Sequence, residues 1–206
     1  MIEAFKKKIS LNRFFEDAKN YVNKENSYLI SYPEFLKYFN DLKTINRHNL
    51  IIGINFTYGW MPTIFDYRSD KFEEAVDILN DAKAGNIPNV DNLILLKELF
   101  NNSLVGTTKL LHFINPVKFA IWDSRVYRYL TNKEPYSSRI GNCNVYMDYL
   151  VFCNYLTNQK EFSIYHKSIE KKIGYSMTAF RIVELVMYLN GEKNITKVNQ
   201  RNANSV

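Results

Sequence analysis

Apolar side chains recur every three or four residues through most of this chain, a spacing that places them on one face of an α-helix. The pattern predicts helices over residues 2–25, from Ser31, from Asp70, from Asp91, and over 143–157, 164–173 and 177–189. Only 7 glycines and 5 prolines occur in 206 residues, so the chain makes few turns. Few turns and long elements favour an all-α fold over a many-stranded sheet.

The chain has no internal repeat and no low-complexity linker. Its length suits one substantial domain or two small lobes that share a core. We therefore expect a single helical domain over residues 1–191. The remaining segment, 192–206, is polar and rich in asparagine, and it is expected to be a flexible tail.

Helix starts are expected where capping residues precede an apolar run. Ser31 is followed by Pro33 in what would be a first helical turn, and Asp70 and Asp91 are expected to cap the next two helices. Residues 131–142 are expected to form a polar loop.

Residues 50–65 depart from the regular pattern. The segment begins as a buried helix or strand, and Gly59 and Pro62 then break regular structure. The break places Tyr58 and Trp60 on a bend. Large flat side chains on a bend can stack on a nucleobase, or they can simply fill the core.

Composition adds a weak indication of a nucleic-acid partner. The net charge is +6 and the pI is about 9.1, which suits a polyanion but also fits a merely basic soluble protein. The 15 tyrosines and 14 phenylalanines accompany many Asn, Lys and Ile residues, a combination that AT-rich genomes produce without any functional cause.

The cysteine and histidine content argues against a metal site or cofactor. Cys143 and Cys153 cannot make a four-cysteine zinc or iron–sulfur site, and three scattered histidines cannot complete one. Free thiols point to the reducing cytoplasm. We expect no membrane association, because no apolar run is long enough to span a bilayer and the N-terminus lacks the apolar core of a secretory signal.

The stretch from Gly106 to Leu130 carries the most functional information. A turn is expected at Gly106, and a new helix at about Thr107. The first N–H groups of a helix have no internal partner, and together with the helix dipole they form an anion site. The backbone of this turn is therefore a candidate for gripping a DNA phosphate, through Val105, Gly106, Thr107 and Thr108.

Lys109 and Asp123 are the candidate catalytic residues. Lys109 is expected in the first turn of the new helix, where the positive helix end and partial burial lower the pKa of an amine and make it a nucleophile. Asp123 follows a short apolar run and precedes a helix, so it is expected to be an ionised N-cap. A fixed carboxylate can stabilise the cationic sugar that forms when a glycosidic bond breaks.

These residues resemble the helix-hairpin-helix DNA glycosylases of base excision repair. Gly106-Thr-Thr-Lys109 is similar to the end of the family's hairpin, and Ile121-Trp-Asp-Ser-Arg-Val-Tyr-Arg128 to the segment that bears its catalytic aspartate. The resemblance covers about 25 residues plus the all-helical pattern around them. The chain has a single glycine in the hairpin, and it lacks the cluster-binding cysteines of some members.

The resemblance implies two helical lobes, a helix-hairpin-helix element and an active site in the cleft between the lobes. It implies a monomer that binds double-stranded DNA and flips out one damaged or modified base. Asp123 would then stabilise the sugar cation, and Lys109 would form a Schiff base that permits strand nicking. A non-catalytic helical protein that keeps only the DNA-binding hairpin is the alternative.

Other residues near the two catalytic candidates have implied roles. The candidates for phosphate contact are Arg125, Arg128 and Arg181, and those for the base pocket are Tyr58, Trp60, Trp122 and His112. Each group has a structural alternative: Arg181 can pair with Glu184 three residues later on its helix, and His112 and Trp122 can belong to the core. Lys109 can likewise be a surface lysine or the ion-pair partner of Asp123.

Overall fold

A computed structural model describes residues 5, 9–23, 27–61 and 66–192, and these residues form eleven helices and no strand. The predicted all-α fold is confirmed for this part of the chain. The helices are α2 (Leu11–Lys19), α3 (Ser27–Asp41), α4 (Arg47–Gly59), α5 (Phe72–Lys83), α6 (Val90–Leu99), α7 (Leu104–Ile114), α8 (Ser124–Thr131), α9 (Ser137–Ile140), α10 (Cys143–Thr157), α11 (Phe162–Ile173) and α12 (Ala179–Asn190).

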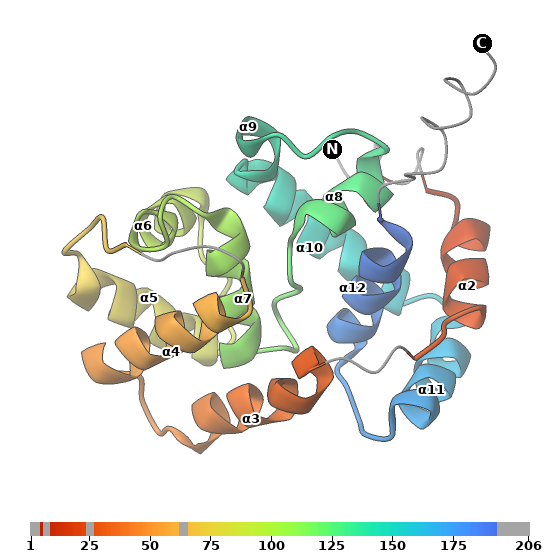
Figure 1. The fold of residues 1–206 in the computed structure, drawn as a ribbon, viewed down its shortest axis with the longest axis horizontal. Coiled ribbons are helices and arrows are strands. Elements are labelled where there is room, and N and C mark those ends of the chain that lie inside the picture. Colours follow the sequence, from red (N-terminus) through yellow and green to blue (C-terminus); the bar gives the residue numbers. More distant parts are fainter. Residues whose placement is uncertain (1–4, 6–8, 24–26, 62–65, 193–206) are drawn as a thin grey trace, which may run out of the picture.

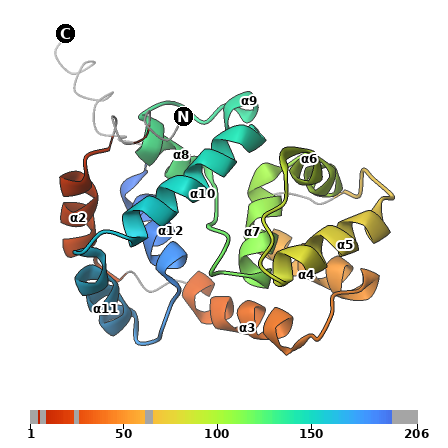
Figure 2. The same cartoon turned by 180° about the vertical axis from the view of Figure 1, so that it is seen from behind.

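The helices form two groups that lie side by side (Figure 1; seen from behind in Figure 2). In one group α7 packs against α3, α4, α5 and α6. In the other, α12 packs against α2, α8, α10 and α11. The chain passes from the first group to the second through residues 115–123, which follow α7, and α10 also contacts α6. Each group therefore has a mostly buried central helix, and α7 and α12 supply the residues that matter below.

Several helix starts differ from the sequence predictions because a neighbouring residue acts as the cap. Asn89, not Asp91, caps α6, and its side chain accepts a hydrogen bond from the backbone of Asn92. Helix α5 begins at Phe72 after Lys71, so Asp70 lies outside it and does not cap it. Both errors are of one or two residues, which is the usual uncertainty of a helix end.

Helix α3 begins at Ser27, so Ser31 does not start it and Pro33 lies inside it. Proline has no N–H to offer the carbonyl four residues earlier. Here that carbonyl belongs to Leu29, and it accepts a hydrogen bond at 3.1 Å from the hydroxyl of Tyr175. A side chain from the other group of helices thus replaces the missing donor, which explains how the helix continues through the proline.

The two chain ends differ in part from the predictions. The helix expected over residues 2–25 is observed as α2, which ends at Lys19; the predictions for residues 2–4, 6–8 and 24–25 lie outside the described residues. The expected flexible tail also lies outside them, apart from Glu192. The predicted polar loop over 131–142 contains the short helix α9. In the described ranges, every helix is too short or too polar to cross a bilayer.

Candidate active site

Helix α7 begins three residues earlier than expected, and this moves the turn. Ser103 is its N-cap and accepts a hydrogen bond from the backbone of Gly106, so Gly106 lies inside the first turn of the helix. The connection between α6 and α7 is made by Asn101 and Asn102, both in the left-handed region with φ of 53° and 60°. Asparagine tolerates this region better than most residues. The prediction of a turn at Gly106 is therefore wrong.

Gly106 is required for packing rather than for a turn. A Cβ at this position would lie 2.7 Å from a ring carbon of Phe100, the residue that follows α6. The glycine thus lets the start of α7 approach the end of α6. The contact between Gly106 and the ring of Phe100 therefore allows α6 and α7 to pack closely where they are connected.

The predicted phosphate contacts at the start of α7 are mostly buried. The hydroxyl of Thr107 donates to the carbonyl of Ser103 at 3.0 Å, and Thr108 is fully enclosed. Gly106 is buried as well, and only Val105 is partly exposed. Because α7 starts at Leu104, its unpaired N–H groups lie before Gly106 rather than after it. Thr107, Thr108 and Gly106 therefore have no surface from which to contact DNA.

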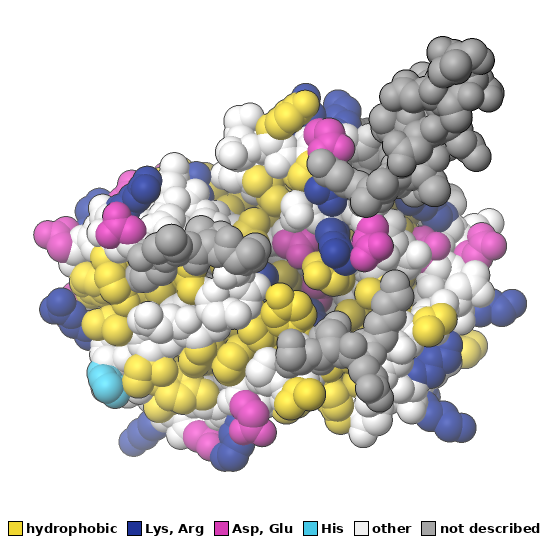
Figure 3. Space-filling view, viewed as in Figure 1, with side chains coloured by type: hydrophobic (Ala, Val, Ile, Leu, Met, Phe, Trp, Pro, Cys, Tyr) yellow, Lys and Arg dark blue, Asp and Glu magenta, His cyan; other side chains and the backbone are white. Residues whose placement is uncertain are grey.

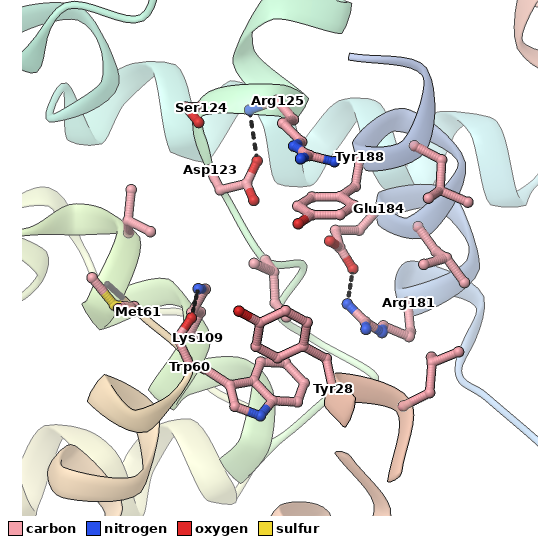
Figure 4. Close-up of a pocket in the computed structure, with 15 residues that line it drawn as sticks. Tyr28, Trp60, Met61, Lys109, Asp123, Ser124, Arg125, Arg181, Glu184 and Tyr188 are labelled. Carbon is pink, nitrogen blue, oxygen red and sulfur yellow. Dashed lines mark hydrogen bonds and ion pairs between the residues drawn. The ribbon is translucent and has the colours of Figure 1, made fainter. Parts of the chain in front are cut away.

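A cavity of about 340 Å³ lies where the two groups of helices meet. Helices α3, α7 and the end of α4 supply one side of it, and the start of α8 with α12 supplies the other (Figure 4). Its lining consists of Tyr28, Leu29, Trp60, Met61, Val105, Lys109, Ile121, Asp123, Ser124, Arg125, Arg181, Glu184, Leu185, Tyr188 and Leu189. Both predicted catalytic residues thus line the same cavity.

The outer face around this junction carries charges of both signs. Figure 3, in the view of Figure 1, shows Lys and Arg side chains interspersed with Asp and Glu, and exposed hydrophobic side chains between them. The positive net charge is therefore not gathered into one stripe on this face.

Asp123 is the N-cap of α8, as predicted. Its Oδ1 accepts hydrogen bonds from the backbone N–H groups of Arg125 at 2.8 Å and of Val126 at 3.0 Å. The other oxygen of the carboxylate points toward the interior of the cavity (Figure 4). The cap therefore fixes the position of the carboxylate while leaving one oxygen available to a ligand.

Lys109 lies in the second turn of α7, and its Nζ donates to the carbonyl of Trp60 at 3.2 Å. Burial lowers the pKa of this amine below its ordinary value. The negative charges of Asp123 and Glu184 oppose the effect of burial, and Arg181 reinforces it. The predicted direction is thus found, but burial rather than the helix start is its main cause.

Arg181 and Glu184 form a buried ion pair on α12, one of the two alternatives that the sequence allowed. Nη1 of Arg181 donates to Oε2 of Glu184, and the two side chains are only 6% and 3% exposed. Burial raises the pKa of Glu184 to about 7, against the opposing effect of Arg181. The prediction that Arg181 contacts a phosphate of the DNA backbone is therefore wrong, because the guanidinium lies inside the protein.

A buried chain of hydrogen bonds fixes the position of Tyr32, whose ring packs against Arg181. The carbonyl of Phe119 can only accept, so Nδ1 of His112, 2.6 Å away, carries the ring proton. Nε2 then accepts from the hydroxyl of Tyr32 at 2.8 Å. The ring of Tyr32 lies under the guanidinium of Arg181, with 4.6 Å from Cζ to the ring centre. Burial, reinforced by Arg181, lowers the pKa of His112 to about 3, so the imidazole is neutral.

Of the four residues predicted for a base pocket, only Trp60 lines the cavity. Tyr58 is buried, and its hydroxyl donates to the carbonyl of Phe100 at 2.8 Å. Trp122 is fully buried, and its indole N–H donates to the carbonyl of Ile140 at 2.9 Å. Together with His112, these residues belong to the core. The base-pocket predictions for Tyr58, Trp122 and His112 are therefore wrong.

Arg125 and Arg128 join the start of α8 to the end of α12. Arg125 lies over the ring of Tyr188 at 4.5 Å and forms an ion pair with Glu192 at 2.7 Å. Arg128 donates to the carbonyl of Gly191 at 3.3 Å. Both residues are partly exposed, so their predicted contact with phosphate remains a prediction. Of the two, Arg125 also lines the cavity.

Sequence reasoning did not identify Tyr28, Glu184 and Tyr188 as cavity residues. A signal for two of them exists. Arg181, Glu184 and Tyr188 are spaced i, i+3 and i+7 on an otherwise apolar helix, so they share one face. A polar stripe on a buried helix indicates a site or a buried interaction. Tyr28 has no comparable signal, because its position depends on how the start of α3 packs against Trp60, the residue that follows α4.

Within the described residues, no three His, Cys, Asp or Glu side chains are placed to hold a metal ion, and both cysteines are free thiols. Comparison of the chain with models of protein families, with curated proteins and with solved structures found no match.

Proposed function

We propose that this protein is a DNA glycosylase that cleaves the bond between deoxyribose and a damaged or modified base held in the cavity. The observation that carries the proposal is the pairing of two groups in one cavity. Lys109 is an amine whose pKa burial lowers, and Asp123 is a carboxylate fixed by two backbone N–H groups. A nucleophilic amine and a carboxylate held in a fixed position are the groups this reaction requires.

The cavity suits a flipped base in size and lining. Its volume of about 340 Å³ falls within the range of small-molecule sites. Three aromatic side chains line it, those of Tyr28, Trp60 and Tyr188, and aromatic rings stack well on nucleobases. A base in duplex DNA would have to leave the helical stack to enter it.

Lys109 would act as the nucleophile. A neutral amine can donate one N–H to the Trp60 carbonyl and keep its lone pair for C1′ of the sugar. When the lone pair forms a bond to C1′, the bond from C1′ to the base breaks, and its electron pair leaves with the base, which takes up a proton. Loss of a proton from Nζ and opening of the sugar ring at O4′ then give a Schiff base. Elimination of the 3′ phosphate from that intermediate would nick the strand.

Asp123 would stabilise the positive charge that develops on the sugar as the base departs. Its free oxygen faces the cavity, and its bonded oxygen is held by the backbone, so little reorganisation would be needed during the reaction. If water rather than Lys109 attacked C1′, the same carboxylate would position it, and the enzyme would remove the base without nicking the strand.

The arrangement of helices supports the proposal. The connection of α6 to α7 through Asn101 and Asn102 would be the helix-hairpin-helix element that grips duplex DNA, in place of the predicted turn at Gly106. The two groups of helices would be the two lobes, with the active site between them. A monomer acting in the cytoplasm, in repair or in defence against phage with modified DNA, is the role we propose.

A panel of duplexes that carry single lesions or phage-type modified bases tests the proposal. Wild-type protein is expected to release a free base from at least one duplex and leave an alkali-labile site. Borohydride is expected to trap Lys109 on that DNA, and Lys109→Gln is expected to abolish trapping. Asn is also a good N-cap, so Asp123→Asn should preserve α8 while slowing base release at least about a hundredfold.

Two results would contradict the proposal. One is release of base by Asp123→Asn at the full rate, which would remove the carboxylate from the reaction. The other is binding of every duplex without release of any base by the wild type. The second result would favour a non-catalytic helical DNA-binding protein.

A further inference from the structure

We propose that the Arg181–Glu184 pair recognises the edge of a planar heterocycle that presents a hydrogen-bond acceptor beside a donor. This inference rests on the proposed function, since it names the part of the substrate that the cavity would hold. It extends that function from bond cleavage to selection of the base. The residues that select would be on α12, while those that react would be on α7 and at the start of α8.

The pair has unused hydrogen-bonding groups on the cavity wall. Nη1 of Arg181 and Oε2 of Glu184 bond to each other. Within the described residues, Nη2 and Nε of Arg181 and Oε1 of Glu184 have no hydrogen-bond partner, and Nε is fully enclosed. Figure 4 shows both head groups on the side of the cavity opposite Lys109. Nη2 of Arg181, a donor, and Oε1 of Glu184, an acceptor, therefore lie next to each other. The hydrogen bond between Nη1 and Oε2 fixes the separation of the two head groups.

A purely structural role explains the pair poorly. Burying two charges is expensive, and apolar residues of similar volume usually stabilise a core as well or better. The cost of burying both charges is offset if a ligand in the cavity supplies hydrogen-bond partners for Nη2 of Arg181 and Oε1 of Glu184.

The guanidinium is held in place before any ligand arrives. Cζ of Arg181 lies 4.6 Å from the centre of the Tyr32 ring and 5.9 Å from that of Trp60. Tyr32 is in turn anchored to the backbone of Phe119 through His112. A donor that is already oriented loses little entropy when it binds, so it contributes to selectivity more than a mobile surface arginine would.

The chemistry of the pair defines its ligand. The guanidinium donates only, so it requires a carbonyl oxygen or an unprotonated ring nitrogen. The ionised carboxylate accepts only, so it requires a ring N–H or an amino group. The hydrogen-bonding edges of uracil and adenine each offer such an acceptor beside such a donor. A phosphate would place its oxygens against Glu184, and an apolar ring would leave both partners unsatisfied.

Methylated bases provide matched ligands that differ only in the donor. 1-Methyluracil keeps its N3–H and 1,3-dimethyluracil lacks it; 9-methyladenine keeps its amino hydrogens and its N6,N6-dimethyl derivative lacks them. Binding would be followed by NMR or calorimetry at pH 8, above the pKa of about 7 to which burial raises Glu184. We expect at least one unblocked base to bind, and about tenfold or more tighter than its blocked partner.

Two variants and a control assign the discrimination to the pair. Glu184→Gln keeps the size of the side chain and an oxygen for Arg181, but its amide loses the acceptor of the carboxylate. It is expected to reduce the preference for the unblocked base to less than about threefold. Arg181→Lys removes the planar donor and should weaken binding of both unblocked bases. Duplex DNA with an abasic-site analogue lacks a base at the position that would enter the cavity, so all three proteins should bind it equally if the variants fold.

The outcomes separate this inference from the proposed function. Discrimination between the methylated pairs without any base release would support the recognition role and contradict the glycosylase. Base release with the same substrate preference in wild type and Glu184→Gln would support the glycosylase and overturn the recognition role. Failure of all four compounds to bind, or equal binding of blocked and unblocked bases, would also overturn it.

Discussion

Thr108 is hydrogen-bonded to the backbone of Trp122, fourteen residues later in the chain. Its Oγ1 accepts from the N–H of Trp122 at 3.1 Å and lies 3.3 Å from the carbonyl of the same residue. Thr108 precedes Lys109 on α7, and Trp122 precedes Asp123 at the start of α8. One buried hydroxyl therefore links the backbone that carries the amine to the backbone that carries the carboxylate.

Replacing Thr108 by valine should loosen this link. Valine has a similar shape but leaves the N–H of Trp122 buried without a partner, a loss of about 1–3 kcal/mol in the free energy of unfolding. Base release is expected to slow about tenfold or more, because a small displacement of a reacting group is costly. Denaturant unfolding and single-turnover kinetics measure the two effects. Thr108→Ser keeps the hydroxyl and is the control; if valine and serine variants behave alike, the link does not position Asp123.

The amine of Lys109 should titrate below its ordinary value of 10.5, because burial disfavours the charged form. Asp123 opposes this effect by favouring the ammonium ion, so Asp123→Asn should lower the pKa of Lys109 further. NMR of ¹³C-labelled lysine follows the titration, and Lys109→Arg identifies the signal by its loss. Asp91→Asn changes an exposed carboxylate on α6 that does not line the cavity and should leave the midpoint in place. An unchanged or raised midpoint in Asp123→Asn would show that the two groups do not interact.

His112 should make the protein less stable in acid. Its pKa is about 3 in the folded protein and ordinarily 6.5, so between these values the unfolded chain binds the extra proton. Stability from this group is complete above pH 6.5 and is lost as the pH falls, by about 1.4 kcal/mol per unit. Glu184 acts in the opposite direction: its pKa rises from 4.5 to about 7, so its contribution is present below pH 4.5 and is lost as the pH rises.

Guanidinium unfolding of the wild type and of two variants between pH 4 and 8 separates the two contributions. His112→Gln should show a shallower loss of stability between pH 6.5 and 4 than the wild type. Glu184→Gln should show a steeper loss over the same interval, because the opposing contribution of the carboxyl is gone. Parallel curves for all three proteins would mean that neither group changes its proton affinity on folding.

The sequence predicted the helices better than their ends. Helix α10 occupies residues 143–157 as expected, since a long apolar periodicity is a strong local signal. Starts were misplaced where two polar residues compete for one cap, as Asn89 and Asp91 do before α6. Glycine usually marks a turn, so the sequence predicts the turn before α7 at Gly106, whereas Asn101 and Asn102 form it and Gly106 allows the close contact with Phe100.

The candidate site likewise has features that a few neighbouring residues determine and features that only the packing of distant helices determines. The cap formed by Asp123 is a property of its own few residues, so the sequence could predict it. The burial of Lys109 and the position of Glu184 depend on how α12 packs beside the start of α8 and faces α7 across the cavity. Such contacts join segments that are 48 or more residues apart in the sequence, as Thr131 at the end of α8 and Ala179 at the start of α12 are, and no local pattern encodes them. The role of His112 is hidden from the sequence for the same reason, because its partners Tyr32 and Phe119 lie on other segments.

Gly106 and Gly59 provide a test of the packing at the start of α7. An alanine at Gly106 would place its Cβ 2.7 Å from a ring carbon of Phe100, and such overpacking costs about 1–3 kcal/mol, partly offset by the better helix propensity of alanine. Gly59 is the last residue of α4, is exposed, and has nothing within 4 Å of an added Cβ. Gly59→Ala should therefore be neutral or stabilise by up to about 1 kcal/mol. Thermal and denaturant unfolding of the two variants would decide the matter: equal stabilities would mean that Phe100 moves aside freely and that Gly106 does not determine how closely α6 and α7 pack.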